Sequence, residues 1–419
     1  MAKLSVPTLQ PIPQATTPEP VLRTTCCIVG GGPAGAMLGL LLARQDIPVV
    51  LLESHVDFDR DFRGDTVFPS VLDVMYELGL IDKLMNIPHT KISKLRMQTP
   101  KGTIALADYS RLRIRFPHVT ILPQPNFISL LVEEAKQYPH FQVLMGAQVD
   151  GLIEESGQVC GVRYRGQNGR GEVRAQLTVG ADGRFSRVRK LAGLEPKLAE
   201  PTMDILWTRL SRKPSDPDLA TVIQSDKGIL SVSPRPDVWQ LGYPIPKGGY
   251  ARVRERGLEA LRRSIAGIAP LFEDRVDEIK DWKHISVFSI QAYCLKRWYA
   301  PGVLLIGDSA HAMSPIAGAG INLAVQDAVT ASNILGEKLK ANDVQLVDMA
   351  RIQRERTLPV KLIQGHQQKL QKRLVEPLEK EGTPPNLPVM MRVFFSIPFL
   401  RDIPMKVLSF GLRPVHIKA

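Results

Sequence analysis

The residues with the clearest chemical potential lie in one run near the end of the chain, Gly307–Ala328. A short apolar segment precedes this run and is typical of a buried strand. Alanines at three- and four-residue spacing follow it, as in a helix packed on a sheet. Pro315, Gly318 and Gly320 predict a tight turn at the N-terminus of that helix. Unpaired N–H groups at such a terminus attract a phosphate or another group with partial negative charge. Asp308, at the strand end, is placed to accept a hydrogen bond from a ligand hydroxyl.

A second glycine-rich turn lies near the start of the chain, between a β-rich segment, Thr24–Val29, and a helix-forming segment, Ala36–Gln45. Its glycines have the GxGxxG spacing and are Gly30, Gly32 and Gly35. The first allows a tight turn, the second lets the backbone approach a pyrophosphate, and the third lets the helix pack on the strand. A second strand, Pro48–Leu52, ends at Glu53, 18 residues beyond the last glycine and near the usual spacing of a ribose-binding acid. These features predict a dinucleotide site without choosing between FAD and NAD.

A third run, Val179–Arg189, contains Ala-Asp-Gly-x-x-Ser-x-Val-Arg around Asp182. It closes a stretch of expected strands, 141–179, in which glycine-containing turns mark two hairpins. We therefore expect a three-stranded antiparallel meander that leads into this run.

The three runs together resemble the motifs of the flavoprotein aromatic hydroxylases, the single-component FAD-dependent monooxygenases of the para-hydroxybenzoate hydroxylase type. The pattern Gly-Asp-x-Ala-His-x-x-x-Pro-x-x-Gly-x-Gly-x-Asn-x-x-x-x-Asp-Ala is similar to the family's second flavin-binding motif. The run around Asp182 resembles its Asp-Gly motif, which bridges the FAD pyrophosphate and the path of the nicotinamide donor. The resemblance covers roughly residues 24–339, and the motifs fall in the family's order.

This resemblance implies an α/β fold: a Rossmann-like FAD-binding domain with an inserted, mainly antiparallel β-sheet substrate domain and C-terminal helices. The domains that we expect are a disordered lead-in, 1–23; an FAD-binding domain, 24–90 with 121–200 and 284–345; a substrate domain, 91–120 with 201–283; and a C-terminal helical region and tail, 346–419.

The resemblance also implies roles for individual residues. The glycine triplet would hold the pyrophosphate of FAD, Glu53 the adenosine ribose, and Asp308 the ribityl hydroxyls. Residues 315–322 would contact the isoalloxazine through backbone groups, with Pro315 at the catalytic centre. The complete set of candidate cofactor-binding residues is Gly30, Gly32, Pro33, Ala34, Gly35, Glu53, Ser54, Arg63, Gln124, Val149, Asp182, Gly307, Asp308, Pro315, Gly318, Gly320, Ile321 and Asn322.

Some of these residues have a second interpretation. Arg63 matches an arginine that lies near the flavin and its phosphates in the family, or is a solvated loop charge. Gln124 matches a residue that reaches the ribityl chain or the ring, or caps its own helix. Five residues on expected strands of the substrate domain either line a substrate pocket or belong to the core: Trp207, Arg209, Trp239, Gln240 and Tyr243.

The implied activity is that of an FAD-dependent monooxygenase. It would take electrons from NADH or NADPH, bound only transiently, and hydroxylate an aromatic or quinone-like small molecule with O2 through a flavin hydroperoxide. Two alternatives stay open. One is an FAD-dependent oxidoreductase or epoxidase of the same fold that acts on a lipophilic or isoprenoid substrate at a membrane surface; the other is a non-enzymatic flavin-binding module. We expect no metal site.

Composition agrees with a globular enzyme, with 44% hydrophobic and 23% charged residues. The 54 basic and 42 acidic residues give a net charge of +12, which indicates an anionic cofactor, an anionic substrate or an anionic membrane surface. Nucleic acid is disfavoured because the basic residues are not interleaved with aromatics. Four cysteines give neither a disulfide framework nor a metal spacing and favour the cytoplasm. No apolar run is long enough to predict a transmembrane helix.

The C-terminal region is the least determined part. Helices are expected from Gly336 to about Leu378, with breaks at Pro359 and Pro377. The apolar run Leu387–Leu400, flanked by basic residues, either packs on the body, lies in a membrane interface, or forms half of a dimer contact. We favour packing because nearby prolines break the run. The protein is therefore expected to be a monomer or a homodimer, free in the cytoplasm or in peripheral contact with a membrane.

Overall fold

The computed structural model describes residues 21–59, 65–167, 169–199, 203–217 and 220–379, and in the tail residues 397, 402, 405–407, 409–410 and 414–418. Arg63, most of the apolar run 387–400 and most of the lead-in 1–23 lie outside the described residues.

The FAD-binding domain is built on a sheet with the order β19-β20-β11-β1-β2-β8, and β10 and β9 continue antiparallel from β11. The meander expected from the turn signals is thus confirmed. The strands are β1 Val21–Val29, β2 Val49–Glu53, β8 Phe141–Met145, β9 Gln148–Glu155, β10 Gln158–Gly166, β11 Gly169–Gly180, β19 Tyr299–Ala300 and β20 Val303–Leu305.

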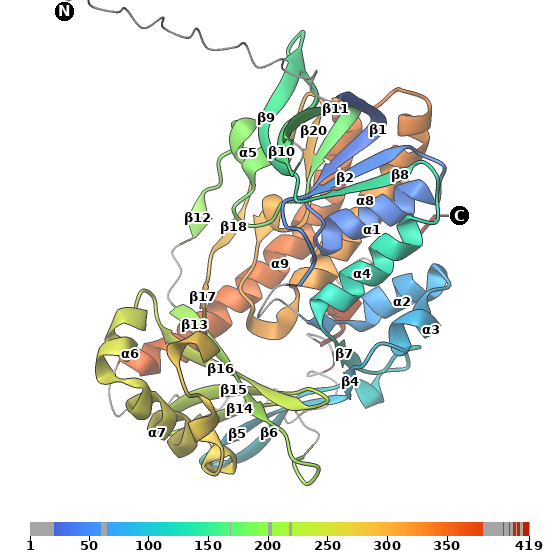
Figure 1. Cartoon of the computed structure of the whole chain (residues 1–419). Coiled ribbons are helices and arrows are strands. Elements are labelled where there is room, and N and C mark those ends of the chain that lie inside the picture. The colour runs from blue at the N-terminus through green and yellow to red at the C-terminus, as the bar shows by residue number, and fades with distance from the viewer. Residues whose placement is uncertain are drawn as a thin grey trace, which may run out of the picture.

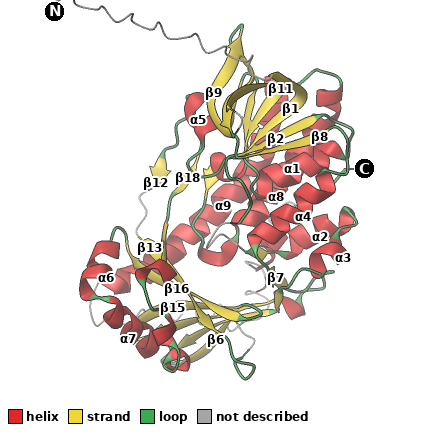
Figure 2. Cartoon of the chain, viewed as in Figure 1, coloured by secondary structure: helices red, strands yellow, loops and turns green. Residues whose placement is uncertain are grey.

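Helices α1 (Pro33–Ala43), α4 (Gln124–Ala135) and α8 (Gly320–Lys340) lie side by side against this sheet (Figures 1 and 2). Their apolar residues and those of the strands form one continuous core. The first helix begins at Pro33, three residues earlier than expected, because proline suits the first helical position, where no intrahelical N–H bond is lost. The first strand begins at Val21 because its N-terminal residues pair in parallel with β11.

The substrate domain is a seven-stranded sheet with the order β17-β13-β16-β15-β14-β5-β6. All its neighbouring strands are antiparallel except β14 and β5, which confirms the expected mainly antiparallel insertion. The strands are β5 Lys94–Thr99, β6 Gly102–Asp108, β13 Met203–Ser211, β14 Ala220–Ser225, β15 Gly228–Pro234, β16 Val238–Pro246 and β17 Ser286–Ser289. Since β17 pairs with β13, the chain leaves this sheet after Ser289, a few residues beyond the expected boundary at 283.

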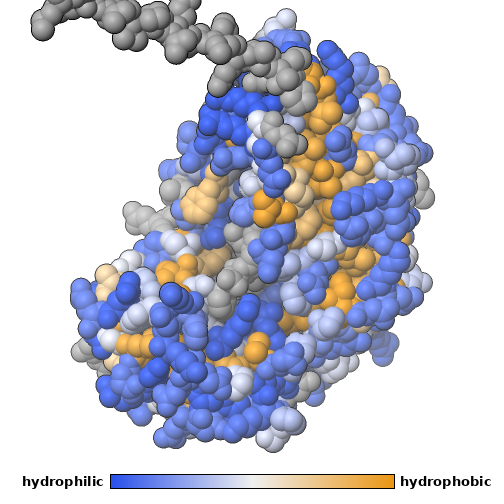
Figure 3. Space-filling model, in the orientation of Figure 1, coloured by the Kyte–Doolittle hydropathy of each residue, from blue (hydrophilic) through white to orange (hydrophobic). Residues whose placement is uncertain are grey.

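Helices α6 (Tyr250–Arg256) and α7 (Leu258–Ile268) follow β16. Leu261, Ile265 and Ile268 of α7 pack against one face of the substrate sheet. In Figure 3 the surface over this part of the protein is largely hydrophilic. The face of the sheet turned away from α7 faces the FAD-binding domain, since Trp207 on that face belongs to the same apolar cluster as Ile316.

Smaller elements complete the fold. They are α2 Pro69–Glu77, α3 Ile81–Met85, α5 Arg187–Leu191, and two three-stranded sheets, β3 Thr66–Val67 with β7 Val119–Ile121 and β4 Thr90–Ile92, and β12 Leu198–Ala199 with β18 Ala292–Cys294 and β21 His311–Ala312. The 3₁₀ turns are Tyr109–Arg111, Pro270–Phe272, Val276–Glu278, Trp282–His284, Gly307–Ser309 and Ile316–Gly318.

One long helix, α9 (Leu346–Glu379), runs from the FAD-binding domain to the substrate domain (Figure 1). The expected breaks at Pro359 and Pro377 are wrong, because α9 is continuous through both positions. A proline inside a helix costs one backbone hydrogen bond, but Arg356, Val360 and Ile363 around Pro359 are buried against the FAD-binding domain. Burial of that face offsets the lost bond.

Two described residues that follow the apolar run 387–400 pack on the body, whereas the packing expected for that run stays a prediction because most of it lies outside the described residues. Met405 lies in an apolar cluster with Phe68 and Tyr109, and Ile417 packs on the main core while its N–H donates to Glu77 at 2.9 Å. Ile397, from the apolar run, is 42% exposed. Among the residues that the structure describes, none belongs to a helix long and apolar enough to cross a membrane.

We predict that Met405→Asp destabilises the protein, because a charge would replace a side chain that is 4% exposed. The expected loss is about 3 kcal/mol in the free energy of unfolding, measured by urea titration. Ile397→Asp is the matched control and should change that free energy by less than about 0.5 kcal/mol. Equal, small effects of both substitutions would show that the tail does not depend on this contact.

Candidate active site

The glycine turn after β1 is shaped by two close backbone contacts. Gly30 has φ +105°, and a Cβ on it would lie 2.5 Å from the Ala181 carbonyl oxygen. A Cβ on Gly35 would lie 1.9 Å from the Gly30 oxygen. Gly32 differs, because its φ is −73° and the nearest atom to a Cβ there is 4.0 Å away. Packing therefore demands glycine at the first and third positions, whereas the second is open on the side from which a ligand would approach.

Glu53, at the end of β2, lies directly beside this turn. Its side chain is buried, with 2% exposed, and Oε2 accepts the Gly31 N–H at 2.8 Å. Oε1 accepts the His55 N–H at 3.0 Å and lies 3.2 Å from the Ser54 hydroxyl. The acid predicted from its spacing thus also fixes the glycine turn, and the predicted cofactor residue Ser54 reaches the site through it.

Asp182 lies at the end of β11 and holds the start of α5. Its Oδ2 accepts the N–H groups of Arg187 at 2.6 Å and Val188 at 3.0 Å, and its Oδ1 accepts the Ser186 hydroxyl. Burial is the largest influence on this carboxyl and raises its pKa. The described contacts of Asp182 therefore give it a positioning role for the Asp-Gly loop.

The Gly307–Ser309 turn after β20 faces the glycine turn. Gly307 has φ +61°, and a Cβ on it would lie 3.1 Å from the Cβ of Ala34 in α1. Arg189 and Tyr293 join this turn to the Asp-Gly loop. The Arg189 guanidinium donates to the Ser309 carbonyl at 3.1 Å, and the Tyr293 hydroxyl donates to the Asp308 carbonyl at 2.7 Å. The three runs identified in the sequence therefore meet at one edge of the sheet.

The N-terminus of α8 completes this edge. Gly318 has φ +64° and packs against Thr66, while a Cβ on Gly320 would meet no atom within 4 Å. The buried Asn322 side chain binds the Ser70 hydroxyl and donates to the Ser409 carbonyl at 3.3 Å. Contact with a ligand would therefore come from backbone groups of 320–322, since the first N–H groups of a helix have no partner within it. Pro315 is half-buried and precedes this turn, and Ile321 is buried.

These features fit FAD. The open sides of Gly32 and Gly320 leave room where a pyrophosphate and a flavin would meet helix N-termini. Pro33 and Ala34 form the first turn of α1 beside the Gly307 turn. Among the described residues there is no group of three or more His, Cys, Asp or Glu side chains that could hold a metal ion. The arrangement can therefore bind a dinucleotide flavin, whose redox chemistry needs no metal.

Comparison with known proteins decides the family. The FAD-binding domain family matches residues 23–361. The chain belongs to this family. It is 36% identical over 324 residues to the 6-methylpretetramide 4-monooxygenase of Streptomyces rimosus, an alignment that covers 77% of each chain. The protein is accordingly an FAD-dependent oxidoreductase of the family to which this monooxygenase belongs.

Two further relatives show the breadth of the family. The digeranylgeranylglycerophospholipid reductase of Methanocella arvoryzae is 26% identical over 344 residues, covering 78% of this chain and 81% of that protein. The solved structure of OxyS, the anhydrotetracycline hydroxylase of Streptomyces rimosus, superposes with a TM-score of 0.73 at 21% identity. That alignment covers 94% of this chain and 77% of the hydroxylase. The second likeness confirms the fold.

The remaining predicted flavin residues are less informative. Gln124 is half-buried at the first turn of α4, and no side-chain hydrogen bond caps that helix among the described residues, so its capping interpretation is not supported. Val149 is buried in a second apolar cluster of the FAD-binding domain. Any contact with FAD would therefore come from its backbone.

Strand alternation divides the five predicted substrate residues between the two faces of the sheet. Trp207 packs over Gly242, and Arg209 lies opposite Gln240 on the same face, which is turned toward the FAD-binding domain. Trp239 is buried under α7 against Phe272, and the Tyr243 hydroxyl lies 2.9 Å from Ser264 of α7. The positions of Trp239 and Tyr243 do not support the prediction that they line a pocket, because α7 covers their face.

Several site residues had no role in the sequence interpretation. Arg235, on the face turned toward the FAD-binding domain, forms an ion pair with Asp65 and donates to Gln240, and burial lowers its pKa to about 10. Arg189 carried no signal beyond its place in the Asp-Gly pattern. Asp327 is the aspartate near the end of the flavin-binding pattern, and a carboxylate at a buried position of a helix is the signal that a partner is required.

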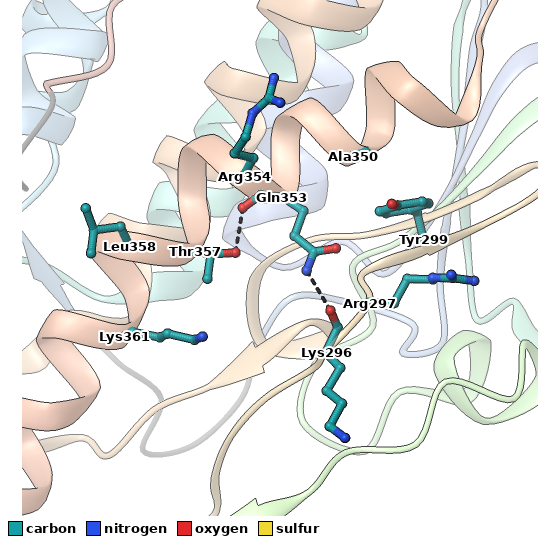
Figure 4. A pocket seen from close by; sticks show the side chains of 9 residues that line it. All are labelled: Lys296, Arg297, Tyr299, Ala350, Gln353, Arg354, Thr357, Leu358 and Lys361. Carbon is teal, nitrogen blue, oxygen red and sulfur yellow. Dashed lines mark hydrogen bonds between the residues drawn. The ribbon is translucent and has the colours of Figure 1, made fainter.

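A separate basic groove of about 530 Å³ lies between α9 and the loop before β19 (Figure 4). Gln353 of α9 donates to the Lys296 carbonyl at 2.8 Å and fixes that loop. No predicted site residue lines the groove, whose lining is Lys296, Arg297, Tyr299, Ala350, Gln353, Arg354, Thr357, Leu358 and Lys361. Part of the excess positive charge is therefore gathered away from the flavin site.

We predict that Gly32→Ala and Gly30→Ala separate cofactor binding from folding. Gly32→Ala meets no protein atom closer than 4.0 Å, so the unfolding free energy of the FAD-free protein should change by less than about 0.5 kcal/mol while FAD affinity falls. Gly30→Ala has a positive φ and a backbone clash, so it should destabilise the FAD-free protein by at least about 1–2 kcal/mol. Urea titration and fluorescence titration with FAD measure the two effects. Unchanged FAD affinity in Gly32→Ala would contradict the placement of the pyrophosphate.

Proposed function

We propose that the protein hydroxylates an aromatic or quinone-like small molecule in the space between the substrate sheet and the turn Ile316–Gly318, which we call the flavin turn. The observation that carries the proposal is the 36% identity, over most of both chains, to a monooxygenase that acts on 6-methylpretetramide. Bound FAD would supply the redox chemistry, taking electrons from NADH or NADPH and reacting with O2. The chain's own residues bind the cofactor, orient the substrate and limit access of water.

The composition of the inner face of the substrate sheet supports this substrate class. Trp207 offers an aromatic surface near Ile316 of the flavin turn, and Gln240 and Arg235 place a hydrogen-bonding amide and a cation farther along the same face. A planar ring with polar substituents would match both halves of this face. An isoprenoid chain would match only the aromatic half of this face and would offer no polar group to the other half.

A second candidate function is reduction of an isoprenoid lipid. It is favoured by the 26% identity to the digeranylgeranylglycerophospholipid reductase, and the inner face of the sheet argues against it. We further propose that the enzyme works in the cytoplasm as a monomer or homodimer with its tail packed on the body, since Met405 and Ile417 of the tail contact the body.

We predict that oxidation of NADH or NADPH consumes one equivalent of O2 when a hydroxylatable phenol is present. Parallel measurements with an oxygen electrode and by absorbance of the nicotinamide give the ratio. Asp308→Ala, which removes the proposed ribityl partner, should reduce the rate at limiting FAD. Oxidation that proceeds without O2, and only with a polyprenyl lipid, would instead establish the reductase.

We predict that Trp207→Leu lowers kcat/KM for the best aromatic substrate about tenfold or more, because it removes ring contact equivalent to at least one or two methylene groups. Tyr243→Phe, on the opposite face of the same sheet, is the matched control and should leave kcat/KM within about twofold. A larger effect of Tyr243→Phe than of Trp207→Leu would show that the substrate does not use the inner face.

A further inference from the structure

A buried charge network lies directly beneath the Gly307–Ser309 turn. Asp327 of α8 is 0% exposed, and its Oδ2 accepts the Gly307 N–H at 3.0 Å. The same oxygen lies 2.5 Å from His311 Nε2, while Oδ1 accepts Arg356 Nε at 2.8 Å. The side chains of His311 and Arg356 are each 2% exposed. One carboxylate thus joins the turn, β21 and α9.

Asp327 acts as an ion in this network. Burial raises its pKa, but His311 and Arg356 together outweigh burial and hold the pKa of the carboxyl below its usual range. A carboxylate only accepts hydrogen bonds, so His311 Nε2 carries the proton in the bond between them. The Gly307 N–H, the imidazole and the guanidinium are therefore three donors converging on one anion.

The turn is held on its other side as well. The Asp308 carbonyl accepts the Tyr293 hydroxyl at 2.7 Å, the Gly307 carbonyl accepts the Ala310 N–H at 3.0 Å, and the Ser309 carbonyl accepts Arg189. These contacts fix the backbone from which the Asp308 side chain projects. Asp327 supplies a contact to the turn from α8. It lies two helical turns after Gly320, the first residue of that helix.

Helix α9 reaches this network twice. Arg356 binds Asp327 directly, and the Gln353 side-chain oxygen accepts the backbone N–H of Trp298 at 3.0 Å. The buried Trp298 ring lies against His311, with ring centroids 4.8 Å apart. A helix outside the nucleotide-binding fold therefore braces the Gly-Asp turn through one charge and one aromatic ring.

Stability alone does not account for three buried polar groups at this place. Replacing a buried ion pair by apolar side chains of similar volume is often neutral or stabilising, because removing the charges from water costs about as much as their attraction returns. What apolar side chains cannot supply is a directed acceptor for the Gly307 N–H. The network therefore matches a need for a fixed turn geometry more closely than a need for stability.

We propose that Arg356 and His311 are positioning residues for FAD, which act through Asp327 to hold the Gly307–Asp308 turn in the geometry that the ribityl chain requires. The inference rests on FAD binding and does not depend on which substrate is hydroxylated, so it fails or succeeds separately from the proposed function.

The test compares Arg356→Met and Arg356→Lys with Arg354→Met, an exposed arginine on the same helix, as the matched control. Arg356→Met should weaken FAD binding at least tenfold in fluorescence titration of the FAD-free protein. It should also alter the visible circular dichroism of the flavin in the saturated protein. Arg356→Lys should recover part of both signals, and Arg354→Met should match the parent protein. The midpoint of thermal unfolding without FAD is recorded for each variant.

A lower unfolding midpoint with unchanged FAD affinity and unchanged flavin dichroism in Arg356→Met would overturn the proposal, since a purely structural role predicts that pattern. If Arg356→Met does not fold, His311→Gln and His311→Leu replace it. Glutamine retains an N–H donor for Asp327 and leucine does not, so only His311→Leu should change FAD affinity and flavin dichroism. Equal values of these signals for the two variants would also overturn the proposal.

Discussion

The close approach of two backbone loops is the constraint on which the rest of the site depends. The Ala181 N–H donates to the Val29 carbonyl at 2.7 Å, and the Gly30 N–H donates to the Leu52 carbonyl at 2.7 Å, so β11, β1 and β2 end at one level. This leaves no room for a side chain at Gly30, where a Cβ would lie 2.5 Å from the Ala181 oxygen. Parallel strands end at the same edge, and the turns that follow β1, β2, β11 and β20 are brought together there.

Polar contacts then fix what the apolar core cannot orient. Apolar packing is nearly non-directional, so it can press α1 and α8 onto the sheet without deciding where a carbonyl or a carboxylate points. Arg189 donates to carbonyl oxygens of both the Asp-Gly loop and the Gly307–Ser309 turn, Tyr293 donates to the Asp308 carbonyl, and Asp327 accepts an N–H of that turn. Each buried polar group left without a partner would cost about 1–3 kcal/mol, so the loops are stable only where these partners meet.

The sequence predicted what local chemistry determines. The strand, glycine turn, helix and acid around Gly30 follow from short-range spacing, and the meander from turn residues, and the structure confirms both. Pro359 was wrongly expected to end a helix, because the local cost of a proline is visible in the sequence and the burial that offsets it is not. The role of Arg356 depends on a partner 29 residues away, and no local pattern predicts such a contact. The contact between Arg235 and Asp65 arises only when the two domains meet.

The two faces of β16 show why the alternation of side chains along a strand could not identify the substrate residues. Alternation assigns Trp239 and Tyr243 to one face and Gln240 to the other, but it does not say which face meets the cofactor. The answer lies in α7, whose apolar stripe must be buried against a sheet face, and Leu241 and Trp239 offer the more apolar one. Burial of α7 therefore leaves the more polar face, with its hydrogen-bonding side chains, opposite the flavin turn. The face of the sheet that we propose for the substrate is in this way determined by the packing of a helix on the opposite face.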